Sequence, residues 1–502
     1  MSELPIATGF YEDAVKPIAA QECTNWLPQA PQTNALTQAQ LVRTQGIDLF
    51  TTVSNFAARG AIVMDSLAYT VNGSQLHRVD SDGTVTNLGT IAGSGKASLA
   101  TNGTQICIVV PGATSYVYSV AGGLVTITDT DFTTTLGPSE QVVFVDGYFV
   151  HYNNASAASN QAVFFISNLN DATAYDPLDF GTAEADPDNI TGLHVNANRL
   201  HVGGFKTIEL MANIGGDGFP FQRINGGLIQ KGIRAKFSSQ DFDNSFCFVG
   251  GGKNESPAVW RLSGQGAQKI STAAIDNILQ DLTSSELEDV FSTTYAENGA
   301  FIYYIHLNSR TFGYDAATKV WHERKSKNTA LQLVNWRVNG IIEIYGKILV
   351  TDNLSGRIGE LSKDSVTEYG ESIQRVVSTQ PFTNAGNSLS FSEMEITCET
   401  GMADPVAVGL SRFDVEGYQE VGFDEPPFLI ANFPPYIQRQ FSDDGGYTWS
   451  NATSRSLGRQ GEYNIRQVWK REGAANRMRI YRFIVDEPVK TSIIKLEADV
   501  AA

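Results

Sequence analysis

Histidines are the first candidates for chemistry, because imidazole serves as a general base and as a metal ligand near neutral pH. The chain has six of them: His77, His151, His194, His201, His306 and His322. His322 precedes Glu323, but Arg324 and Lys325 follow, so the His-Glu-x-x-His pattern of zinc proteases is not formed. Because no other spacing points to a site, we predict no catalytic residue, no metal and no cofactor.

Two short segments contain the residue types of ligand loops. Residues 250–253 read Gly-Gly-Gly-Lys, but Asn254 follows where a phosphate-binding loop needs Ser or Thr, and the upstream glycine is missing. Three nearby carboxylates could hold calcium: Glu184, Asp186 and Asp188. Pro187 stiffens that stretch, and it lacks the Gly-then-Glu order of an EF-hand. Neither segment therefore predicts a bound ligand.

Glycan hydrolysis is the remaining chemistry to consider. A sialidase needs an arginine cluster, a Tyr–Glu nucleophile pair and an acidic residue in the mouth of a propeller. Arginine, tyrosine and glutamate are all present, but no spacing singles out a set. A glycan hydrolase, or a glycan-binding adhesin without catalysis, stays open as an alternative function.

Composition limits the partners and the compartment. The 502 residues are 42% hydrophobic and carry a net charge of −18, so the surface as a whole should repel nucleic acid. DNA contact then needs a local basic patch, or passage through a channel whose acidic wall lets DNA slide. Four widely spaced cysteines predict reduced thiols rather than disulfides or zinc: Cys23, Cys107, Cys247 and Cys398. No signal peptide and no stable membrane insertion are expected.

Residues 441–450 contain the pattern Ser-x-Asp-x-Gly-x-Thr-Trp. Asp444 can accept hydrogen bonds from nearby backbone N–H groups, and Gly445 or Gly446 can adopt positive φ, so together they favour a tight hairpin turn. The pattern resembles the Asp-box turn of sialidase-type propellers and of many phage tail proteins. We interpret it as a structural turn without chemistry, formed by five residues: Ser442, Asp444, Gly446, Thr448 and Trp449.

Most of the chain predicts strands. Hairpin dipeptides recur between apolar runs: Asn72-Gly73, Asp82-Gly83, Asn102-Gly103, Asp146-Gly147, Asn298-Gly299 and Asn339-Gly340. Glycine-ended strands near 200–205 and 246–252, and a similar strand at 301–307, follow one another at blade-like spacing, and 301–323 resembles a kelch-type blade. These features predict an all-β fold: a β-propeller body of roughly five to seven blades.

One helical interruption is expected at about 270–292. Ser271-Thr272 precedes apolar residues at helical spacing, and Thr283 with Glu286 forms a capping box. We predict three parts: an N-terminal arm at 1–55, the propeller at 56–375, and a C-terminal β-sandwich at 376–502 that contains the Asp-box hairpin. Trp26 either docks the arm onto its own domain or contacts another subunit.

The last part of the chain is locally basic. Eight cations lie there: Arg455, Arg459, Arg466, Lys470, Arg471, Arg477, Arg479 and Arg482. They indicate either a patch that faces a partner or DNA, or ordinary solvated strand faces balanced by neighbouring carboxylates. We favour the second interpretation.

Three stretches carry a family resemblance. The first contains Arg199-Leu200, Phe219-Pro220-Phe221 and Gln230-Lys231-Gly232-Ile233. The second is the helical insert. The third contains Val468-Trp469-Lys470-Arg471, Arg479-Ile480-Tyr481-Arg482 and Asp486-Glu487-Pro488. In this order they resemble the packaged-DNA stabilisation proteins of short-tailed phages, which are tail hub or nozzle proteins.

The resemblance implies a non-enzymatic structural protein of the virion tail, made and assembled in the host bacterial cytoplasm. In that family, copies form a ring, expected here to be a hexamer, below the portal and its adaptor. The ring extends the DNA channel, carries a needle or plug, lies near tailspikes or fibres, and retains the packaged DNA until ejection. The arm and the helical insert are our candidates for contacts with neighbours.

Overall fold

The structure is a computed structural model that describes residues 2–30, 35–154, 162–183, 185–186, 188–216, 218–297, 299–385, 387–403, 407–409, 428–430 and 434–501. The chain divides into two compact units. We call Gln45–Gly370 the propeller unit, and Met1–Thr44 together with Glu371–Ala502 the sandwich unit. Strands dominate both, and none of the described helices is long and apolar enough to cross a membrane.

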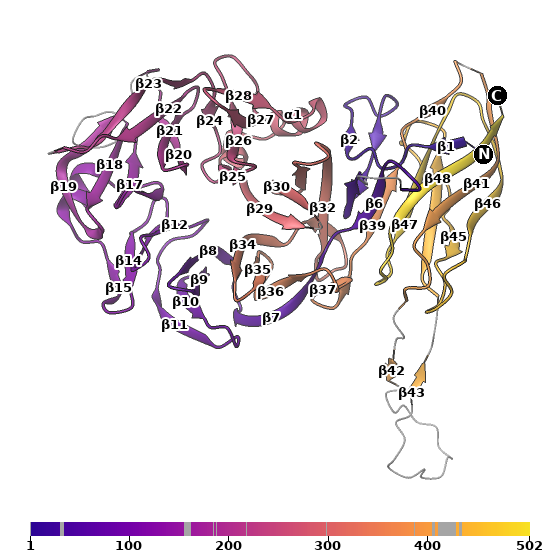
Figure 1. The fold of residues 1–502 in the computed structure, drawn as a ribbon, viewed down its shortest axis with the longest axis horizontal. Coiled ribbons are helices and arrows are strands. Elements are labelled where there is room, and N and C mark those ends of the chain that lie inside the picture. The colour runs from indigo at the N-terminus through magenta and orange to yellow at the C-terminus, as the bar shows by residue number, and fades with distance from the viewer. Residues whose placement is uncertain are drawn as a thin grey trace, which may run out of the picture. The chain divides into compact units, whose positions relative to one another are not determined.

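The propeller unit consists of seven antiparallel sheets, each a blade, which follow one another in chain order around a centre (Figure 1). Blade 1 contains β8 (Ala58–Met64), β9 (Leu67–Asn72), β10 (Gln75–Val79) and β11 (Val85–Thr90). Blade 2 contains β12 (Ser98–Thr101), β13 (Gln105–Val109), β14 (Tyr116–Ser119) and β15 (Gly123–Thr126). Blade 3 contains β16 (Val142–Val145), β17 (Tyr148–Asn153), β18 (Val163–Asn168) and β19 (Asp171–Thr182).

Blade 4 contains β20 (Ile190–Asn196), β21 (Arg199–Gly204), β22 (Ile208–Asn213) and β23 (Phe221–Ile229). Blade 5 contains β24 (Gly232–Ile233), β25 (Gln240–Phe242), β26 (Ser245–Gly251), β27 (Ala258–Ser263) and β28 (Gly266–Lys269). Blade 6 contains β29 (Phe291–Glu297), β30 (Ala300–His306), β31 (Thr311–Asp315), β32 (Trp321–Lys327) and β33 (Leu333–Asn335). The glycine-ended strands expected as repeats are β21 and β26, and the similar strand is β30. Each of the three lies inside its blade and pairs with strands on both sides.

Blade 7 joins the two ends of the propeller unit. It contains β34 (Val338–Ile344), β35 (Lys347–Asp352) and β36 (Gly356–Ser362), and β7 (Gly46–Ser54) pairs with β36 as the fourth strand. The short β37 (Thr367–Glu368) runs parallel to β7. The first strand of the unit therefore completes its last blade, which closes the ring of blades.

Hydrophobic side chains hold neighbouring blades together. One cluster joins blades 1 and 2 through residues such as Tyr69 and Ile108, and another joins blades 2 and 3 through residues such as Cys107 and Phe165. Similar clusters join blades 3 and 4, blades 4 and 5, and blades 7 and 1. Because each blade buries apolar surface on its neighbours, the blades stabilise one another.

Most of the hairpin predictions are confirmed. Gly73, Gly83, Gly103 and Gly147 adopt positive φ in turns between strands. Gly299 does the same, while its partner Asn298 lies outside the described residues.

The prediction of a turn at Asn339-Gly340 is wrong. Both residues lie inside β34, where the register with β35 shifts between Val338 and Gly340. Gly340 does not adopt positive φ, so its absent side chain accommodates a bulge rather than a turn.

The helical insert lies between blades 5 and 6. It contains α1 (Ala273–Gln280) and α2 (Ser284–Glu288), and the capping box of Thr283 and Glu286 is formed. Thr272 is at the N-cap of α1 but makes no side-chain cap bond. Instead, Ser271 donates to the carboxylate of Asp276 in the first turn, at 2.5 Å. A π-helical turn, η1 (Asp131–Leu136), precedes blade 3 and is absent from the sequence expectations.

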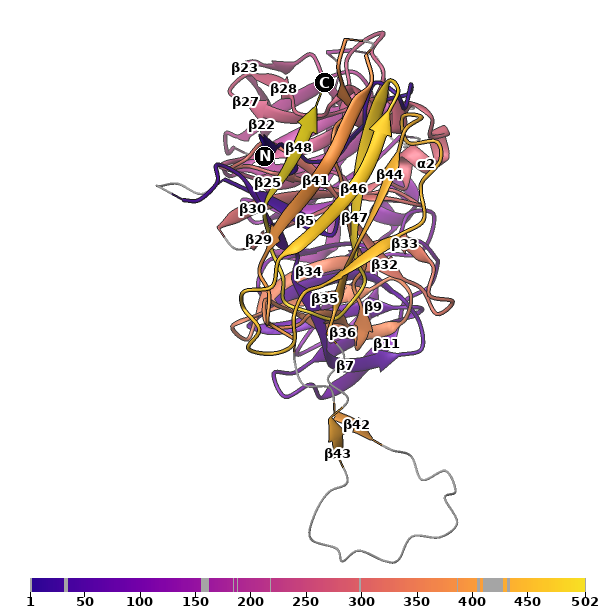
Figure 2. The same cartoon turned by 90° about the vertical axis from the view of Figure 1, so that its right-hand side faces the viewer.

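The sandwich unit has two large sheets, and Figure 2 shows β48, β41 and β46 of one of them side by side. That sheet contains β1 (Ser2–Leu4), β5 (Trp26–Gln29), β6 (Gln40–Arg43), β41 (Leu389–Cys398), β46 (Gln467–Ala475) and β48 (Ile493–Ala501). The other contains β4 (Cys23–Thr24), β39 (Arg375–Ser378), β40 (Phe382–Thr383), β44 (Tyr436–Ser442), β45 (Thr453–Ser456) and β47 (Met478–Val485). The remaining short strands of the unit are β2 (Tyr11–Glu12), β3 (Ala20–Gln21), β38 (Glu371–Ser372), β42 (Ala407–Gly409) and β43 (Phe428–Ile430).

Aromatic side chains fill the space between these sheets. The rings of Phe391 and Tyr481 are 5.5 Å apart, and those of Trp469 and Phe483 are 5.8 Å apart. The segment expected as an arm at 1–55 contributes strands to both units, since β1, β4, β5 and β6 pair within the sandwich unit and β7 within the propeller unit. Trp26 is fully buried in the sandwich unit.

Candidate functional site

The first strands of the blades line an axial cavity of about 500 Å³ in the propeller unit. Its wall contains Gly60, Ala61, Ser98, Val142, Val143, Leu193, Gln240, Thr293, Thr294 and Ile341, among others. Gln141 ties three blades together at this wall: its side chain accepts from the backbone N–H of Leu193 and donates to the carbonyls of Leu193 and Lys236.

Lys96 is the lysine of this cavity. Its amine donates to the backbone carbonyl of Asn339 at 3.0 Å and to the side-chain oxygen of Asn339 at 3.1 Å, and it lies 3.8 Å from the ring centre of Phe291. The amide of Asn339 in turn donates to the carbonyl of Ala58 in blade 1. These contacts connect blades 1, 6 and 7 at the axis.

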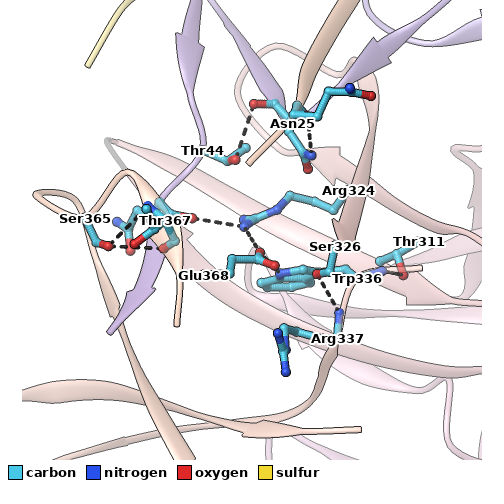
Figure 3. A network of polar contacts seen from close by, with 12 residues as sticks. Asn25, Thr44, Thr311, Arg324, Ser326, Trp336, Arg337, Ser365, Thr367 and Glu368 are labelled. Atoms are coloured by element: carbon cyan, nitrogen blue, oxygen red, sulfur yellow. Dashed lines mark hydrogen bonds and ion pairs between the residues drawn. The ribbon is translucent and has the colours of Figure 1, made fainter. Parts of the chain in front are cut away.

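A second polar centre surrounds Arg324 in the propeller unit (Figure 3). Its guanidinium donates to the hydroxyl of Tyr295 at 3.1 Å and to the carbonyl of Gln45 at 3.0 Å, and it lies 3.6 Å from a carboxylate oxygen of Glu368. The ring of Trp336 lies 4.1 Å from the guanidinium, and its indole N–H donates to Glu368 at 3.1 Å. We call five side chains the closure cluster: Tyr295, Glu297, Arg324, Trp336 and Glu368.

The closure cluster binds both ends of the propeller unit. Glu297 accepts from the backbone N–H of Gln45 at 2.7 Å, one residue before β7, and Glu368 belongs to β37 near the other end. Beside it, Arg337 forms a buried bidentate pair with Asp352 at 2.7 and 3.1 Å. Burial raises the pKa of Glu368 even though Arg324 and Arg337 counteract it.

The closure cluster contains the residue types of a sialidase site. Tyr295 donates to Glu297 at 2.6 Å, and Arg324 donates to Tyr295. Their exposed fractions are 1%, 2% and 0%, respectively, so none of the three can touch a glycan without local unfolding. Their hydrogen bonds to one another and to Gln45 serve closure of the ring of blades.

The histidines also serve packing. His151 lies between the hydroxyls of Ser139 and Tyr175, at 3.0 and 3.1 Å, and burial lowers its pKa to about 3. Burial likewise lowers the pKa of His322 to about 3 and that of His201 to about 4. His194 makes a 3.1 Å contact with Asp241. The described residues contain no group of three His, Cys, Asp or Glu side chains placed to hold a metal ion.

The Asp-box residues form a compact turn between β44 and β45. The carboxylate of Asp444 accepts from Ser442 Oγ at 2.7 Å, from the backbone N–H of Thr448 at 3.0 Å and from Thr448 Oγ1 at 2.5 Å. These hydrogen bonds hold the pKa of Asp444 well below its usual range. Gly446 has a φ of +95°, and the ring of Trp449 lies 4.0 Å from the guanidinium of Arg482.

The acidic stretch considered for calcium has other partners. Asp188 accepts from the backbone N–H of Lys206 at 2.8 Å, and Asp186 forms an ion pair with the Lys206 amine at 3.3 Å. Glu184 and Pro187 lie outside the described residues.

Several cations of the C-terminal segment are paired. Arg479 is buried and binds Asp443 through two hydrogen bonds of 2.6 and 2.7 Å, and Arg466 pairs with Glu395 at 2.5 Å. Lys470 lies 4.0 Å from Glu393. These pairs leave the segment less basic than its sequence indicates.

Sequence reasoning missed Lys96 and the closure cluster. Lys96 meets a residue 243 positions away, and Arg324 meets one 279 positions away. No local pattern marks such contacts. The nearest signal is a tryptophan followed by an arginine at 336–337, and such a pair on its own predicts no particular contact.

Comparisons with known proteins agree with this architecture. The family model described as "Bacteriophage P22 Gp10, beta-propeller" matches residues 2–366, and the one described as "Bacteriophage P22 Gp10, beta-sandwich" matches residues 374–501. The chain is 25% identical over 350 residues to the tail hub protein gp10 of Salmonella phage P22. The matched region covers 67% of this chain and 70% of that protein.

The solved structures that the chain matches include the N-terminal domain of Nup159, with 11% identity, a TM-score of 0.39, and coverage of 68% of this chain and 99% of that one. The WD40 beta-propeller domain of Doa1 has 12% identity, a TM-score of 0.36, and coverage of 64% and 98%, respectively. Since the two family models together span both units, the chain belongs to the bacteriophage P22 Gp10 family of β-propeller and β-sandwich proteins.

Proposed function

We propose that this protein is a structural component of a phage tail hub. One observation carries the proposal: the two Gp10 family models match residues 2–366 and 374–501, and the similar phage P22 protein is named a tail hub protein. The relationship extends over both units rather than over one portable domain.

In this proposal, copies of the chain assemble as a ring, expected to be a hexamer, below the portal and adaptor of the virion. A ring with closed symmetry encloses a channel, because each copy presents complementary surfaces to its two neighbours. The packaged DNA is retained behind this channel and leaves through it. A needle or plug and the tailspikes or fibres attach to the same assembly.

The chemistry of the chain suits such a channel. Its net charge of −18 disfavours tight binding to DNA phosphates, so DNA can slide past an acidic wall. The closure cluster ties β7 to blade 7 through buried hydrogen bonds and an ion pair. A propeller closed in this way resists opening under the internal pressure of a filled head better than one with a free first strand.

A non-enzymatic role follows from the same proposal. The Tyr, Glu and Arg side chains that resemble a sialidase set are fully buried and bind the closing segment. A hydrolase function would need a different, exposed set of residues. Release of sugar from bacterial surface polysaccharide by the purified protein would overturn the non-enzymatic assignment.

Electron microscopy of intact virions tests the location. We expect density for a seven-bladed propeller and a sandwich, repeated around the tail axis directly below the portal and adaptor. Density for these units only at the tips of peripheral fibres would contradict the proposal and favour an adhesin.

A further inference from the structure

The axial cavity has an unusual charge for this protein. The chain carries a net charge of −18, yet none of the described residues that line the cavity carries a carboxylate. Lys96 and His194 are its titratable side chains, and hydroxyls of Ser98, Ser239, Thr293 and Thr294 belong to the wall. The described wall therefore holds a lysine and no carboxylate, although the protein as a whole is acidic.

Lys96 has no counter-charge among the described residues. Within the part of the chain that the structure describes, no carboxylate lies within ion-pair distance of its amine, although most other lysines and arginines of the propeller unit have such a partner. The hydrogen-bond acceptors of its amine are two neutral oxygens of Asn339. Removing a charged amine from water without a counter-charge is costly, and this desolvation lowers the pKa of Lys96 to about 7.

One contact opposes this shift and favours the charged form of the amine. The face of an aromatic ring attracts positive charge, and the amine lies 3.8 Å from the ring centre of Phe291. The nearest other titratable groups are His306, which is buried with its pKa lowered, and His194, which binds Asp241 outside the cavity wall. None of these groups supplies negative charge to the cavity.

Some polar groups of the wall are already bonded within the protein: Ser98 Oγ exchanges two hydrogen bonds with the backbone of Val142, and Thr293 Oγ1 lies 2.9 Å from His306 Nε2. The remaining backbone and hydroxyl groups are the further donors. Among the first strands, β8, β12, β16, β20 and β34 each pair with one neighbouring strand only, so their other edge faces the axis, whereas Phe291 of β29 also forms a bridge with Phe237. Backbone N–H groups at such edges and side-chain hydroxyls are the usual partners of small anions. Ser239 Oγ is buried at this wall and has no hydrogen-bond partner among the described residues.

We propose that the axial cavity is a binding site for a small inorganic anion, such as chloride or phosphate, with Lys96 as its charged ligand. The anion supplies the negative charge that Lys96 lacks, and water molecules fill the rest of the roughly 500 Å³. Because Lys96 also contacts blades 6 and 7 through Phe291 and Asn339, the bound anion stabilises the junction of these blades with blade 1.

The test uses the full-length protein in a buffer free of chloride and phosphate, at constant ionic strength. Sodium phosphate or sodium chloride is added, and the Tm and the heat of binding are measured. A ligand that binds only the folded state raises the Tm in a saturable way. We expect Lys96→Met to weaken binding by about tenfold or more, the usual loss for a hydrogen bond to a charged group.

Two further variants keep the test decisive. Lys253→Met removes an exposed lysine of the same unit and should leave anion binding unchanged. Asn339→Asp places a carboxylate at the position that now lies 3.1 Å from the Lys96 amine. This built-in counter-charge should abolish the anion-dependent rise in Tm. Because the variant also loses the amide that donates to Ala58, its fold is checked by circular dichroism. A folded Asn339→Asp variant gives a result that does not depend on whether Lys96→Met folds.

A crystal soaked in bromide locates the site directly. Anomalous density beside the Lys96 amine supports the proposal. No saturable binding by the unmodified protein, an equal response from Lys96→Met, or bromide bound only elsewhere would overturn it.

Discussion

Replacing Arg324 by methionine tests whether the closure cluster holds the propeller together. Methionine keeps much of the aliphatic volume but removes the guanidinium, which donates to Gln45 and Tyr295 and pairs with Glu368. The buried carboxylate of Glu368 then depends on the charge of Arg337, whose effect on it is smaller. Breaking a buried ion pair from one side costs about 3–5 kcal/mol, so we expect the free energy of unfolding to fall by that amount.

The loss should begin at one place in the unit. Gln45 immediately precedes β7, and both of its backbone groups bind the closure cluster, the N–H through Glu297 and the carbonyl through Arg324. When one of these contacts is lost, β7 should open more often than the strands in the middle of the unit. Hydrogen exchange followed by mass spectrometry measures this, and Gly46–Ser54 should lose more protection than the strands of blade 3.

Arg261→Met is the matched control. Arg261 pairs with Asp243 at 2.7 Å in the same unit, but the side chains are 32% and 43% exposed. Water screens such a pair, so the change should stay below about 1 kcal/mol. If urea denaturation gives equal losses for the two variants, or if β7 keeps its protection in Arg324→Met, the closure cluster does not have the role described.

Three other perturbations have defined outcomes. Gly232→Ala should lower the free energy of unfolding by about 3 kcal/mol in urea denaturation, because the new Cβ would lie 2.3 Å from the carbonyl oxygen of Gly204. Gly266→Ala is the control: its Cβ would meet nothing closer than 3.8 Å, so the free energy of unfolding should change by less than about 0.5 kcal/mol. Asp444→Ala should cost about 1 kcal/mol by the same assay, since it removes the acceptor of the Asp-box turn, and a neutral result would contradict that role. His151 has a pKa of about 3 when folded and 6.5 when unfolded, so the unfolded chain binds the extra proton, and the stability present above pH 6.5 should fall as the pH is lowered. His151→Gln should remove up to about 1.4 kcal/mol per pH unit from that slope, and an unchanged slope would show that other groups cause the acid sensitivity.

The sequence predicts the fold class well because strands and their tight turns leave local signals. Asp146-Gly147 shows why: both residues have positive φ, +49° and +87°, which glycine and aspartate tolerate. The dipeptide therefore marks the turn between the first two strands of blade 3.

The equivalent turns of four other blades leave weaker signals. They use Asp65-Ser66, Ala197-Asn198, Asp243-Asn244 and Tyr345-Gly346, all with positive φ at both residues. Ser66, Ala197 and Tyr345 rarely adopt that conformation, so three of these turns are not marked by their sequences. Asp243-Asn244 lacks the glycine of the common hairpin dipeptides, so its signal is weaker than that of Asp146-Gly147. The blades therefore repeat in structure without a clear repeat in sequence. For this reason the sequence predicts a range of blade numbers rather than a single value.

The polar centres are hidden for a different reason. Asn339 looks like a turn residue beside Gly340, yet its side chain accepts from Lys96 and donates to Ala58 of the adjacent blade 1. Gln45 looks like an ordinary polar residue, yet it binds both Glu297 and Arg324. Such roles depend on contacts that form only once the ring of blades has closed, and the hydrophobic periodicity of the sequence does not predict them.

The central claim, a structural role in the tail hub, is tested most directly by genome retention in particles that lack this protein. Heads are filled in its absence, and the DNA that stays protected from nuclease is measured over time. We predict that the heads fill and then lose their DNA, and that added protein restores retention. Heads that stay full but fail to adsorb to cells, or fail to degrade the cell surface, would contradict the account and indicate an adhesin or a glycan hydrolase.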